Sequence, residues 1–316
     1  MITRRDVSSI TDDAEQQLLA AHELTSSDLI ATGTEARVYA LGSDRVLKVY
    51  ADPGQLQALA SIADLYEHLD RATVPFSLPE IHSIEQHGTL LAVTETRLPG
   101  TPMGKAIDLN TPAAEEIYLA ALHNFGGLRL TAPLGRRMLL DPDPTTHSGE
   151  NWTAFLLRLL EQKLPTVLPN LRIDVPAVDS IADRLTARFA YPYTGPEGVI
   201  HGDLYPDNIL VVDGKIGAVL DFGTFTLFGD PLYDLAGACA YYRMYDDDRA
   251  AVRTRLLATA SADLTPDRRA DLADYLHLTA LLSCDLYPEP DTHIRTTGHY
   301  QWAADVLNTP TDWTNR

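Results

Sequence analysis

The sequence predicts an α+β protein of two lobes, a small lobe built on an antiparallel sheet and a larger, mainly helical lobe. Two observations lead to this prediction: apolar and polar residues largely alternate in strand-like runs up to residue 96, and helical spacing dominates after it. At 316 residues and 45% apolar content, the chain is ample for a buried core. We place residues 1–97 in the N-terminal lobe and residues 98–316 in the C-terminal lobe.

The N-terminal lobe opens with a short amphipathic segment near residues 15–24. Residues 29–51 then alternate apolar and polar side chains around turn residues such as Gly33, which predicts a hairpin and a strand series. Apolar residues recur at helical spacing from 55 to 69, and this indicates one helix with its inner face on the sheet. Residues 78–96 return to strand character.

The C-terminal lobe begins at the turn-rich connector "RLPGTPMG", residues 97–104. Three segments then show helical patterns, and we expect the Pro and Gly residues between them to break the helices apart. These segments are residues 112–130, 152–164 and 179–190. Two strand-like runs around Asp213-Gly214 interrupt the helical part, because Asp-Gly between apolar runs is a strong hairpin signal. Helices dominate again from about residue 234.

Composition excludes some classes of partner. The formal net charge of -19 argues against nucleic acid, since phosphate binding needs clustered Lys and Arg. A cationic small substrate would fit this field, although an acidic excess also simply keeps proteins soluble. Cys239 and Cys284 lack metal-ligand spacing and are expected to be core thiols. No apolar stretch approaches the roughly 18 residues of a membrane span, so we expect a cytoplasmic protein without a membrane partner.

The segments "HGDLYPDN", residues 201–208, and "LDFG", residues 220–223, contain the parts of a phosphoryl-transfer site. That reaction needs a carboxylate to orient the attacking hydroxyl and oxygen ligands that hold Mg²⁺ over the phosphates. Asp203 takes the first role, and Asn208, five residues later, is a metal ligand. The hairpin returns Asp221 to the same place as the second metal ligand.

Aspartates also cap turns and helices, and this simpler role is the better interpretation of Asp207 and Asp213. Asp230 and Asp234 are expected to cap and brace the catalytic loop. We expect His201 to hydrogen-bond to the loop backbone, because Asp203 already occupies the position of the proton acceptor.

Residues 201–236 closely resemble the aminoglycoside phosphotransferase family, relatives of protein kinases whose catalytic loop runs HGD and whose metal Asp precedes a GDPxYDLA segment. Here that segment is "GDPLYDLA", residues 229–236, and "LAALHNF", residues 119–125, is similar to a family helix. The looser resemblance covers roughly residues 28–240. It implies a bilobal protein-kinase-like fold, ATP and Mg²⁺ as cofactors, and transfer to a small-molecule hydroxyl.

The resemblance also implies the nucleotide site. A hairpin should cover the phosphates, Lys48 at the end of the next strand should contact the α- and β-phosphates, and residues 91–100 look like the hinge that carries adenine. The residues implied to bind the nucleotide are Lys48, Gly33, Thr34, Glu95, Thr96 and Leu98.

One departure concerns the partner of Lys48. A kinase-like lobe pairs this Lys with a Glu on the following helix, and the predicted helix offers Asp64 and Glu67 about one turn apart. Either could be the partner. If neither reaches Lys48, the active conformation needs another explanation.

The acceptor stays open between an aminoglycoside or other antibiotic, which would make the protein a resistance enzyme, an amino sugar, and a metabolite of a choline- or sugar-kinase-like enzyme. The acidic runs at 244–250 and 285–291 could contact a cationic acceptor, or could simply be solvated. Aromatic rings could stack on a sugar or fill the core. They are Trp152, Tyr191, Tyr193, Tyr241, Tyr242, Tyr287 and Trp302.

Two other functions compete. A non-catalytic nucleotide-binding regulator of the same fold would have no use for a catalytic base such as Asp203. A protein kinase would carry HRD in place of HGD and an A-P-E segment, yet only six residues separate Gly223 from "GDP" and leave no room for an activation loop.

Overall fold

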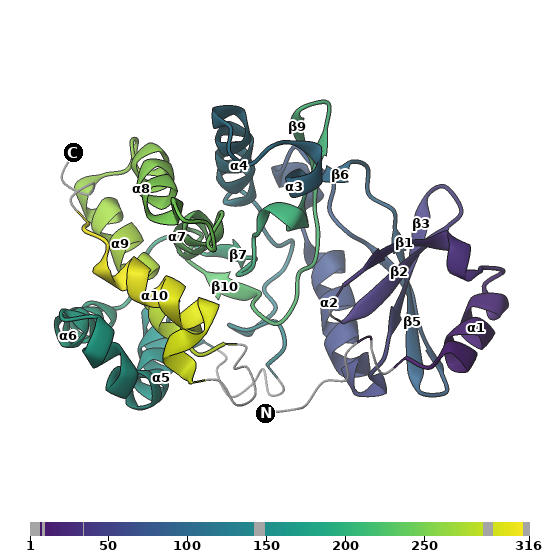
Figure 1. The fold of residues 1–316 in the computed structure, drawn as a ribbon, viewed down its shortest axis with the longest axis horizontal. Helices are drawn as coiled ribbons and strands as arrows, with labels where there is room; N and C mark the ends of the chain where they lie inside the picture. The colour runs from purple at the N-terminus through teal and green to yellow at the C-terminus, as the bar shows by residue number, and fades with distance from the viewer. Residues whose placement is uncertain (1–6, 8–9, 34, 142–148, 287–292, 312–316) are drawn as a thin grey trace.

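The structure is a computed structural model that describes residues 7, 10–33, 35–141, 149–286 and 293–311. Two lobes lie side by side (Figure 1), with the sheet in one and most helices in the other. The predicted two-lobe α+β architecture is therefore confirmed. The expected boundary at residues 97 and 98 lies between β5 and β6.

A five-stranded antiparallel sheet forms the N-terminal lobe in the order β1-β2-β3-β5-β4. Its strands are β1 (Leu29–Thr32), β2 (Ala36–Leu41), β3 (Arg45–Tyr50), β4 (Ile81–His87) and β5 (Leu90–Thr96). Strand β5 lies between β3 and β4, and its first six residues are all buried. This continuous burial follows from coverage of both faces of the sheet, which removes the need for a polar side.

Two helices cover the opposite faces of this sheet. Helix α1 (Asp12–Ala21) packs Leu18 and Leu19 against Leu47 and Leu90 on one face. Helix α2 (Leu56–His68) brings Leu59 to the other face. Figure 1 shows α2 between the sheet and the helical lobe, so its outward side meets the C-terminal lobe.

The C-terminal lobe is mainly helical. Its helices are α3 (Met103–Ala106), α4 (Pro112–Phe125), α5 (Trp152–Asp174), α6 (Val178–Phe189), α7 (Leu232–Tyr241), α8 (Arg249–Ala260), α9 (Pro266–Ser283) and α10 (Gly298–Asn308). Its short strands are β6 (Thr101–Pro102), β7 (Gly198–Ile200), β8 (Ile209–Val212), β9 (Lys215–Val219) and β10 (Leu227–Gly229). The last five form two small antiparallel sheets, β6-β8-β9 and β10-β7.

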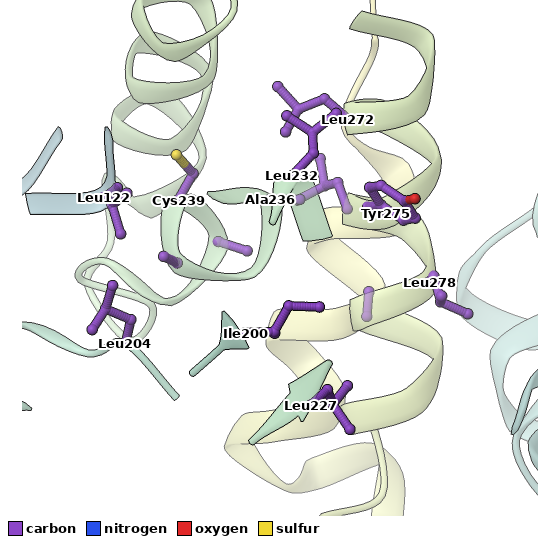
Figure 2. Packing of buried hydrophobic residues seen from close by; sticks show 14 of the residues in the cluster. Leu122, Ile200, Leu204, Leu227, Leu232, Ala236, Cys239, Leu272, Tyr275 and Leu278 are labelled. Carbon is purple, nitrogen blue, oxygen red and sulfur yellow. The ribbon is translucent and has the colours of Figure 1, made fainter. Parts of the chain in front are cut away.

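The core of this lobe joins the short strands to α7 and α9. Figure 2 shows Ile200 and Leu227 of the β7-β10 pair near Cys239 of α7 and Leu278 of α9. Cys239 and Cys284 are buried and unbridged, as expected of core thiols. The strands that carry the catalytic loop are thus anchored in the largest apolar cluster of the described residues.

Helix α5 corrects one expectation. The sequence predicts a helix that ends near residue 164 before proline, but α5 continues through Pro165 and Pro169 to Asp174. Both prolines are exposed and lie four residues apart, so the carbonyl groups that lose a helical hydrogen bond face water. Val167 and Leu171 hold the opposite side of the helix in the core.

The predicted Asp213-Gly214 hairpin is confirmed. Strands β8 and β9 pair antiparallel on either side of it, and both turn residues have positive φ, 49° and 72°. Two positive φ angles in a row characterise the turn that matches the twist of paired strands. Among the described residues, no helix combines the length and hydrophobicity needed to cross a bilayer.

Candidate active site

The catalytic loop runs from β7 to β8 and is held by buried hydrogen bonds. Both oxygens of the Asp234 carboxylate, on α7, accept backbone N–H groups, from His201 at 2.9 Å and from Gly202 at 3.0 Å. Gly202 has φ of +78°, and a Cβ there would lie 2.0 Å from the carbonyl oxygen of Phe225. Only glycine fits this turn, which sets the direction of the chain into Asp203.

His201 has the structural role expected from the sequence. Its Nε2 lies 2.7 Å from the Leu220 carbonyl oxygen, and its Nδ1 accepts the Asp203 backbone N–H at 3.3 Å. Burial lowers the pKa of His201 to about 4, so the imidazole is neutral at pH 7, with its proton on Nε2. The ring therefore joins the catalytic loop to the strand end that carries Asp221.

Asp203 lies at the start of the loop, close enough to Asp221 for the two carboxylates to interact electrostatically. Partial desolvation raises the pKa of Asp203 to about 6, and the negative charge of Asp221 adds to the increase. No hydrogen bond to the Asp203 carboxylate is formed by any residue that the structure describes. An ionised carboxylate with a pKa just below neutral and free lone pairs is suited to accept a proton.

Asn208 and Asp221 lie beside this carboxylate. The Asn208 side-chain amide donates from Nδ2 to the Asp203 carbonyl oxygen at 2.9 Å, which leaves Oδ1 as its free acceptor. The Leu220 backbone N–H donates to the Asn208 carbonyl at 2.8 Å and so joins the two segments. Asp221 has a φ of +59°, a conformation uncommon outside glycine that is concentrated at functional sites.

Lys48 on β3 forms an ion pair that joins the two lobes. Its Nζ lies 3.1 Å from Oδ1 of Asp221 and 3.0 Å from Oε2 of Glu95 on β5. Burial disfavours the charged ammonium, yet the carboxylates of Asp221 and Glu95 raise the pKa of Lys48 well above its ordinary value. In return, the positive charge of Lys48 lowers the pKa of Asp221, and both groups are ionised at neutral pH.

The structure corrects the two candidate partners of Lys48. Asp64 forms an ion pair with Arg136 of the C-terminal lobe, with 2.8 Å between Oδ2 and Nη2, and Glu67 is exposed. The α2 face toward the sheet carries Leu59 and Ile62 instead. Because α-helical residues advance by about 100°, acids two and five positions after Ile62 point away from that face.

Glu95 replaces them from within the sheet. Val46 is directly opposite Glu95 in the β3-β5 ladder, so Lys48, two residues on, is the diagonal neighbour on the same face. Glu95 is only 5% exposed. A sequence signal for this pair existed: Lys48 is the single charge in residues 46–51 and Glu95 is the single charge in residues 89–96, and charges in such apolar runs need partners when they are buried.

The structure describes the other implied nucleotide residues except Thr34. Gly33 ends the β1 side of the β1-β2 turn, where its N–H donates to the Ala36 carbonyl at 2.9 Å, and Thr34 lies outside the described residues. The Thr96 N–H donates to the Glu80 carbonyl. The backbone of Leu98 makes no hydrogen bond to any described residue, and its polar groups are thus available to a ligand.

Two supporting residues were not identified from the sequence. The Tyr118 hydroxyl on α4 lies 2.7 Å from the Leu204 carbonyl and 2.9 Å from the Ala238 carbonyl, and so connects the loop to α7. The Thr226 hydroxyl lies 3.3 Å from the His201 carbonyl and accepts the Gly223 N–H at 3.0 Å. A buried Tyr or Thr carries no distinctive sequence pattern, so only the fold reveals these contacts.

Asp230 has the capping role expected from the sequence, but no hydrogen bond of its carboxylate to a described residue reaches the catalytic loop. Its carboxylate caps the start of α7 by accepting the Leu232 N–H at 3.0 Å, and it accepts the Tyr275 hydroxyl at 2.9 Å. Arg268 completes the shell at 2.7 Å. A cavity of about 1000 Å³ borders this cluster, but Lys48 and the loop residues Asp203 and Asn208 do not line it.

Three aspartates of the acidic runs form ion pairs. Asp246 and Asp248 both bind Arg243 at 2.7 Å, and Asp285 pairs with Lys163. Residues 287–291 of the second run lie outside the described residues. Most of the aromatic candidates belong to the core, as Trp152 and Tyr242 illustrate, whereas Tyr191 is 70% exposed.

Comparison with curated proteins finds homoserine kinases. That of Sinorhizobium medicae is 29% identical over 234 residues, which cover 67% of this chain and 63% of the relative. That of Chelativorans sp. is 29% identical over 244 residues, covering 72% of this chain and 69% of the relative. The chain therefore aligns with less than two thirds of the length of the first of these relatives.

Solved structures share the fold. A thermostable mutant of aminoglycoside phosphotransferase APH(4)-Ia, in a ternary complex with ADP and hygromycin B, has a TM-score of 0.62 at 19% identity, over 95% of this chain and 97% of that one. ADP-bound APH(2'')-Ib has a TM-score of 0.51 at 11% identity, over 96% and 99%. These likenesses confirm the protein-kinase-like fold expected from the resemblance.

A sequence profile of the phosphotransferase enzyme family, APH, matches residues 28–272. This range includes β3 with Lys48, the catalytic loop and Asp221, and it spans well over half of the chain. The protein is a member of the phosphotransferase enzyme family.

Proposed function

We propose that the protein is an ATP- and Mg²⁺-dependent phosphotransferase that acts on a hydroxyl group of a small molecule. The observation that carries this proposal is the convergence of Asp203, Asn208 and Asp221 with Lys48, which come from both lobes and three separate segments. A non-catalytic nucleotide-binding regulator would need Lys48 but not an unbonded carboxylate at Asp203.

Asp203 acts as the proton acceptor for the acceptor hydroxyl. Its pKa of about 6 keeps most of it ionised at pH 7.5, yet close enough to neutrality for proton transfer. The neutral His201 and the two N–H bonds to Asp234 hold its backbone, so that the carboxylate is positioned before the substrates bind. Positioning of this kind supplies most of the catalysis in phosphoryl transfer.

The donor set fits a magnesium ion. Asp221 offers carboxylate oxygens and Asn208 an amide oxygen, and hard cations such as Mg²⁺ prefer oxygen ligands. Asn208 has its Nδ2 committed to the Asp203 carbonyl, which leaves oxygen as its outward atom. A bound Mg²⁺ would neutralise the charge that develops on the transferred phosphoryl group.

Lys48 holds the nucleotide phosphates, with Glu95 as the residue that keeps it in place. Its ammonium stays charged because two carboxylates surround it. We place adenine at the segment after β5, where the free backbone groups of Leu98 can pair with the base, while Glu95 and Thr96 support the segment from the end of the strand. We place the phosphates beneath the β1-β2 turn, which begins at Gly33.

For the acceptor, a hydroxylated amino acid or amino alcohol is the first choice. Support comes from the curated homoserine kinases, which align at higher identity than the aminoglycoside phosphotransferases. The pairing of Asp246, Asp248 and Asp285 with basic residues leaves these runs less negative charge for a polycationic antibiotic. Aminoglycosides and amino sugars form the second class.

The test measures ADP release by the purified protein with Mg²⁺-ATP across homoserine, amino alcohols, amino sugars, aminoglycosides and macrolides. Turnover on one class that disappears in Asp203→Asn and after chelation of divalent ions is the expected result. Tight Mg²⁺-dependent ATP binding without turnover on any class would favour the regulator instead.

A further inference from the structure

A cluster of metal-ligand side chains lies in the N-terminal lobe, outside the catalytic cleft. His22, Glu85 and His87 each offer one ligand atom, and the three atoms lie within 4.8 Å of one another. His22 caps the C-terminal end of α1, and the other two residues belong to the edge strand β4. The site thus joins two elements that are about 60 residues apart in the sequence.

The sheet register brings these side chains together. Glu85 is opposite Ala92 and His87 is opposite Leu90 in the β4-β5 ladder. Ala92 and Leu90 belong to the apolar cluster under α1. Because directly paired residues of an antiparallel ladder share a face, Glu85 and His87 point to the face that α1 covers, where His22 ends the helix.

The atoms are arranged as ligands. Ser83 donates its hydroxyl to Oε1 of Glu85 at 3.1 Å, while Oε2 of Glu85 lies 3.5 Å from Nε2 of His87. Adjacent ligands of a tetrahedral Zn²⁺ ion are about 3.4 Å apart, given metal–ligand bonds of about 2.1 Å. The three ligand atoms lie within 4.8 Å of one another, so side-chain movements of roughly 1 Å would bring them to the separations of a zinc site.

His22 supplies an independent observation. Its Nε2 is inaccessible to solvent and has no hydrogen-bond partner among the described residues. Its ring lies 5.6 Å from that of His87, centroid to centroid. A buried imidazole nitrogen without a partner is unfavourable, and coordination of a metal ion would satisfy it. A cation at this position also faces the C-terminal end of α1, which favours positive charge.

We propose that His22, Glu85 and His87 bind a divalent transition-metal ion, Zn²⁺, with water as the fourth ligand. Two imidazoles and one carboxylate suit Zn²⁺, whereas Mg²⁺ prefers oxygen ligands in octahedral geometry. The ion clamps the end of α1 to the edge strand and stabilises the lobe that carries Lys48. It takes no part in phosphoryl transfer.

The experiment titrates Zn²⁺ into the chelator-treated full chain by calorimetry, with millimolar Mg²⁺ present to occupy oxygen sites. Wild-type protein is expected to bind one equivalent of Zn²⁺, and His22→Gln and His87→Gln are expected to lose it. The matched control is His82→Gln on the same strand, because His82 also has a Glu neighbour, Glu80, at 3.9 Å but does not belong to the cluster. The His82→Gln variant should still bind one equivalent of Zn²⁺.

Two readouts separate coordination from a folding defect. Zn²⁺ should raise the thermal midpoint of the wild type and of His82→Gln, but not that of His22→Gln, while the three metal-free proteins melt alike. Co²⁺ bound in place of Zn²⁺ should show the intense visible absorption of a tetrahedral site in the wild type and lose it in Glu85→Gln. Absence of Zn²⁺ binding by the wild type, or an equivalent that survives both histidine substitutions, would overturn the proposal and leave an ordinary polar contact between His87 and Glu85.

Discussion

Lys48 and Asp203 are held in place by different means. Lys48 lies within a β ladder, and its partner Glu95 comes from the neighbouring strand of the same sheet. Asp203 lies in a loop outside helix and strand, which is held by Asp234 of α7 and by the His201 side chain. A sheet positions a side chain through its own register, whereas a loop needs buried polar contacts to reach comparable precision.

The contrast also concerns the link between the lobes. Helix α2, which is the usual source of the Lys partner in kinase-like lobes, uses Asp64 to contact Arg136 of the other lobe. The position of the Lys48 side chain therefore depends on Glu95 of β5 and not on the placement of α2. Loss of contacts in the loop should then affect turnover, while loss of contacts in the sheet should affect nucleotide affinity.

Asp203→Asn should have the largest effect. The amide cannot accept the proton of the acceptor hydroxyl, so we expect kcat to fall by about 10²- to 10⁴-fold. ATP affinity should stay within about twofold, because Asp203 does not contact Lys48. Initial rates of ADP release together with nucleotide binding by calorimetry check both parts. Near-normal turnover would remove Asp203 from the mechanism.

Asp234→Asn should have the second-largest effect. It removes hydrogen bonds that hold the catalytic loop but leaves Asp203, Asn208 and Asp221 unchanged. Each Asp234 oxygen accepts one backbone N–H, so an amide group must face one of these donors. We expect a loss of about 1–3 kcal/mol in the free energy of unfolding and a clear fall in kcat. Urea denaturation and steady-state kinetics measure them.

The control for Asp234→Asn is Asp213→Asn in the exposed β8-β9 turn, where Asn tolerates the positive φ. This variant should behave as the wild type does. If Asp234→Asn also left both quantities unchanged, the loop would not depend on this carboxylate.

Glu95→Gln should mainly raise the KM for ATP, by about tenfold, which corresponds to about 1.4 kcal/mol. Gln keeps the shape but removes the charge that holds the Lys48 ammonium 3.0 Å away. Asp64→Asn and Glu67→Gln on α2 should leave the KM for ATP near the wild-type value. A raised KM for ATP in an α2 variant, with an unchanged KM in Glu95→Gln, would show that the partner of Lys48 lies on α2.

The smallest of the expected effects near neutrality is the pH dependence of kcat/KM. Asp203 must be ionised to accept a proton, and its pKa is raised to about 6, so kcat/KM should fall to half its plateau near pH 6 and tenfold per pH unit below that. Buffered assays from pH 5 to 8 measure this limb. A plateau that extends unchanged to pH 5 would contradict the assignment.

The raised pKa of Asp203 has the opposite effect on stability: ionisation of Asp203, which turnover requires, destabilises the folded state. The folded state holds the Asp203 proton more tightly than the unfolded chain does, because its pKa is raised from 3.8 to about 6. The contribution of Asp203 to the free energy of unfolding therefore falls as pH rises from about 4 to about 6. Asp203→Asn should reduce this pH dependence in denaturation experiments.

Much of the architecture was predictable from local patterns. Alternation located the strands β2, β3, β4 and β5, and helical spacing located α2 within about one residue at each end. Helix α5 was predicted too short, since the rule that Pro ends a helix ignores a face where unpaired carbonyls reach water. A sequence pattern describes only neighbouring residues, whereas the free-energy cost of a broken helical hydrogen bond depends on whether water or the protein core surrounds the unpaired carbonyl.

The proximity of the catalytic candidates was predictable from their local spacing along the chain. Asp203 and Asn208 share one loop, and a two-residue turn between β8 and β9 returns the chain to Asp221. Short connections leave few ways to separate these residues, so their order along the chain nearly implies their proximity.

Contacts between charged or polar side chains that are far apart in the sequence followed from the packed fold and not from local patterns. Lys48 and Glu95 are paired by the register of two strands, Asp64 is directed to Arg136 by the rotation of α2, and His22 approaches His87 because α1 packs on the sheet. These contacts depend on how apolar faces are buried. Periodicity identifies which face of each element is apolar, but only the packed structure shows what that face covers and which polar groups it brings together.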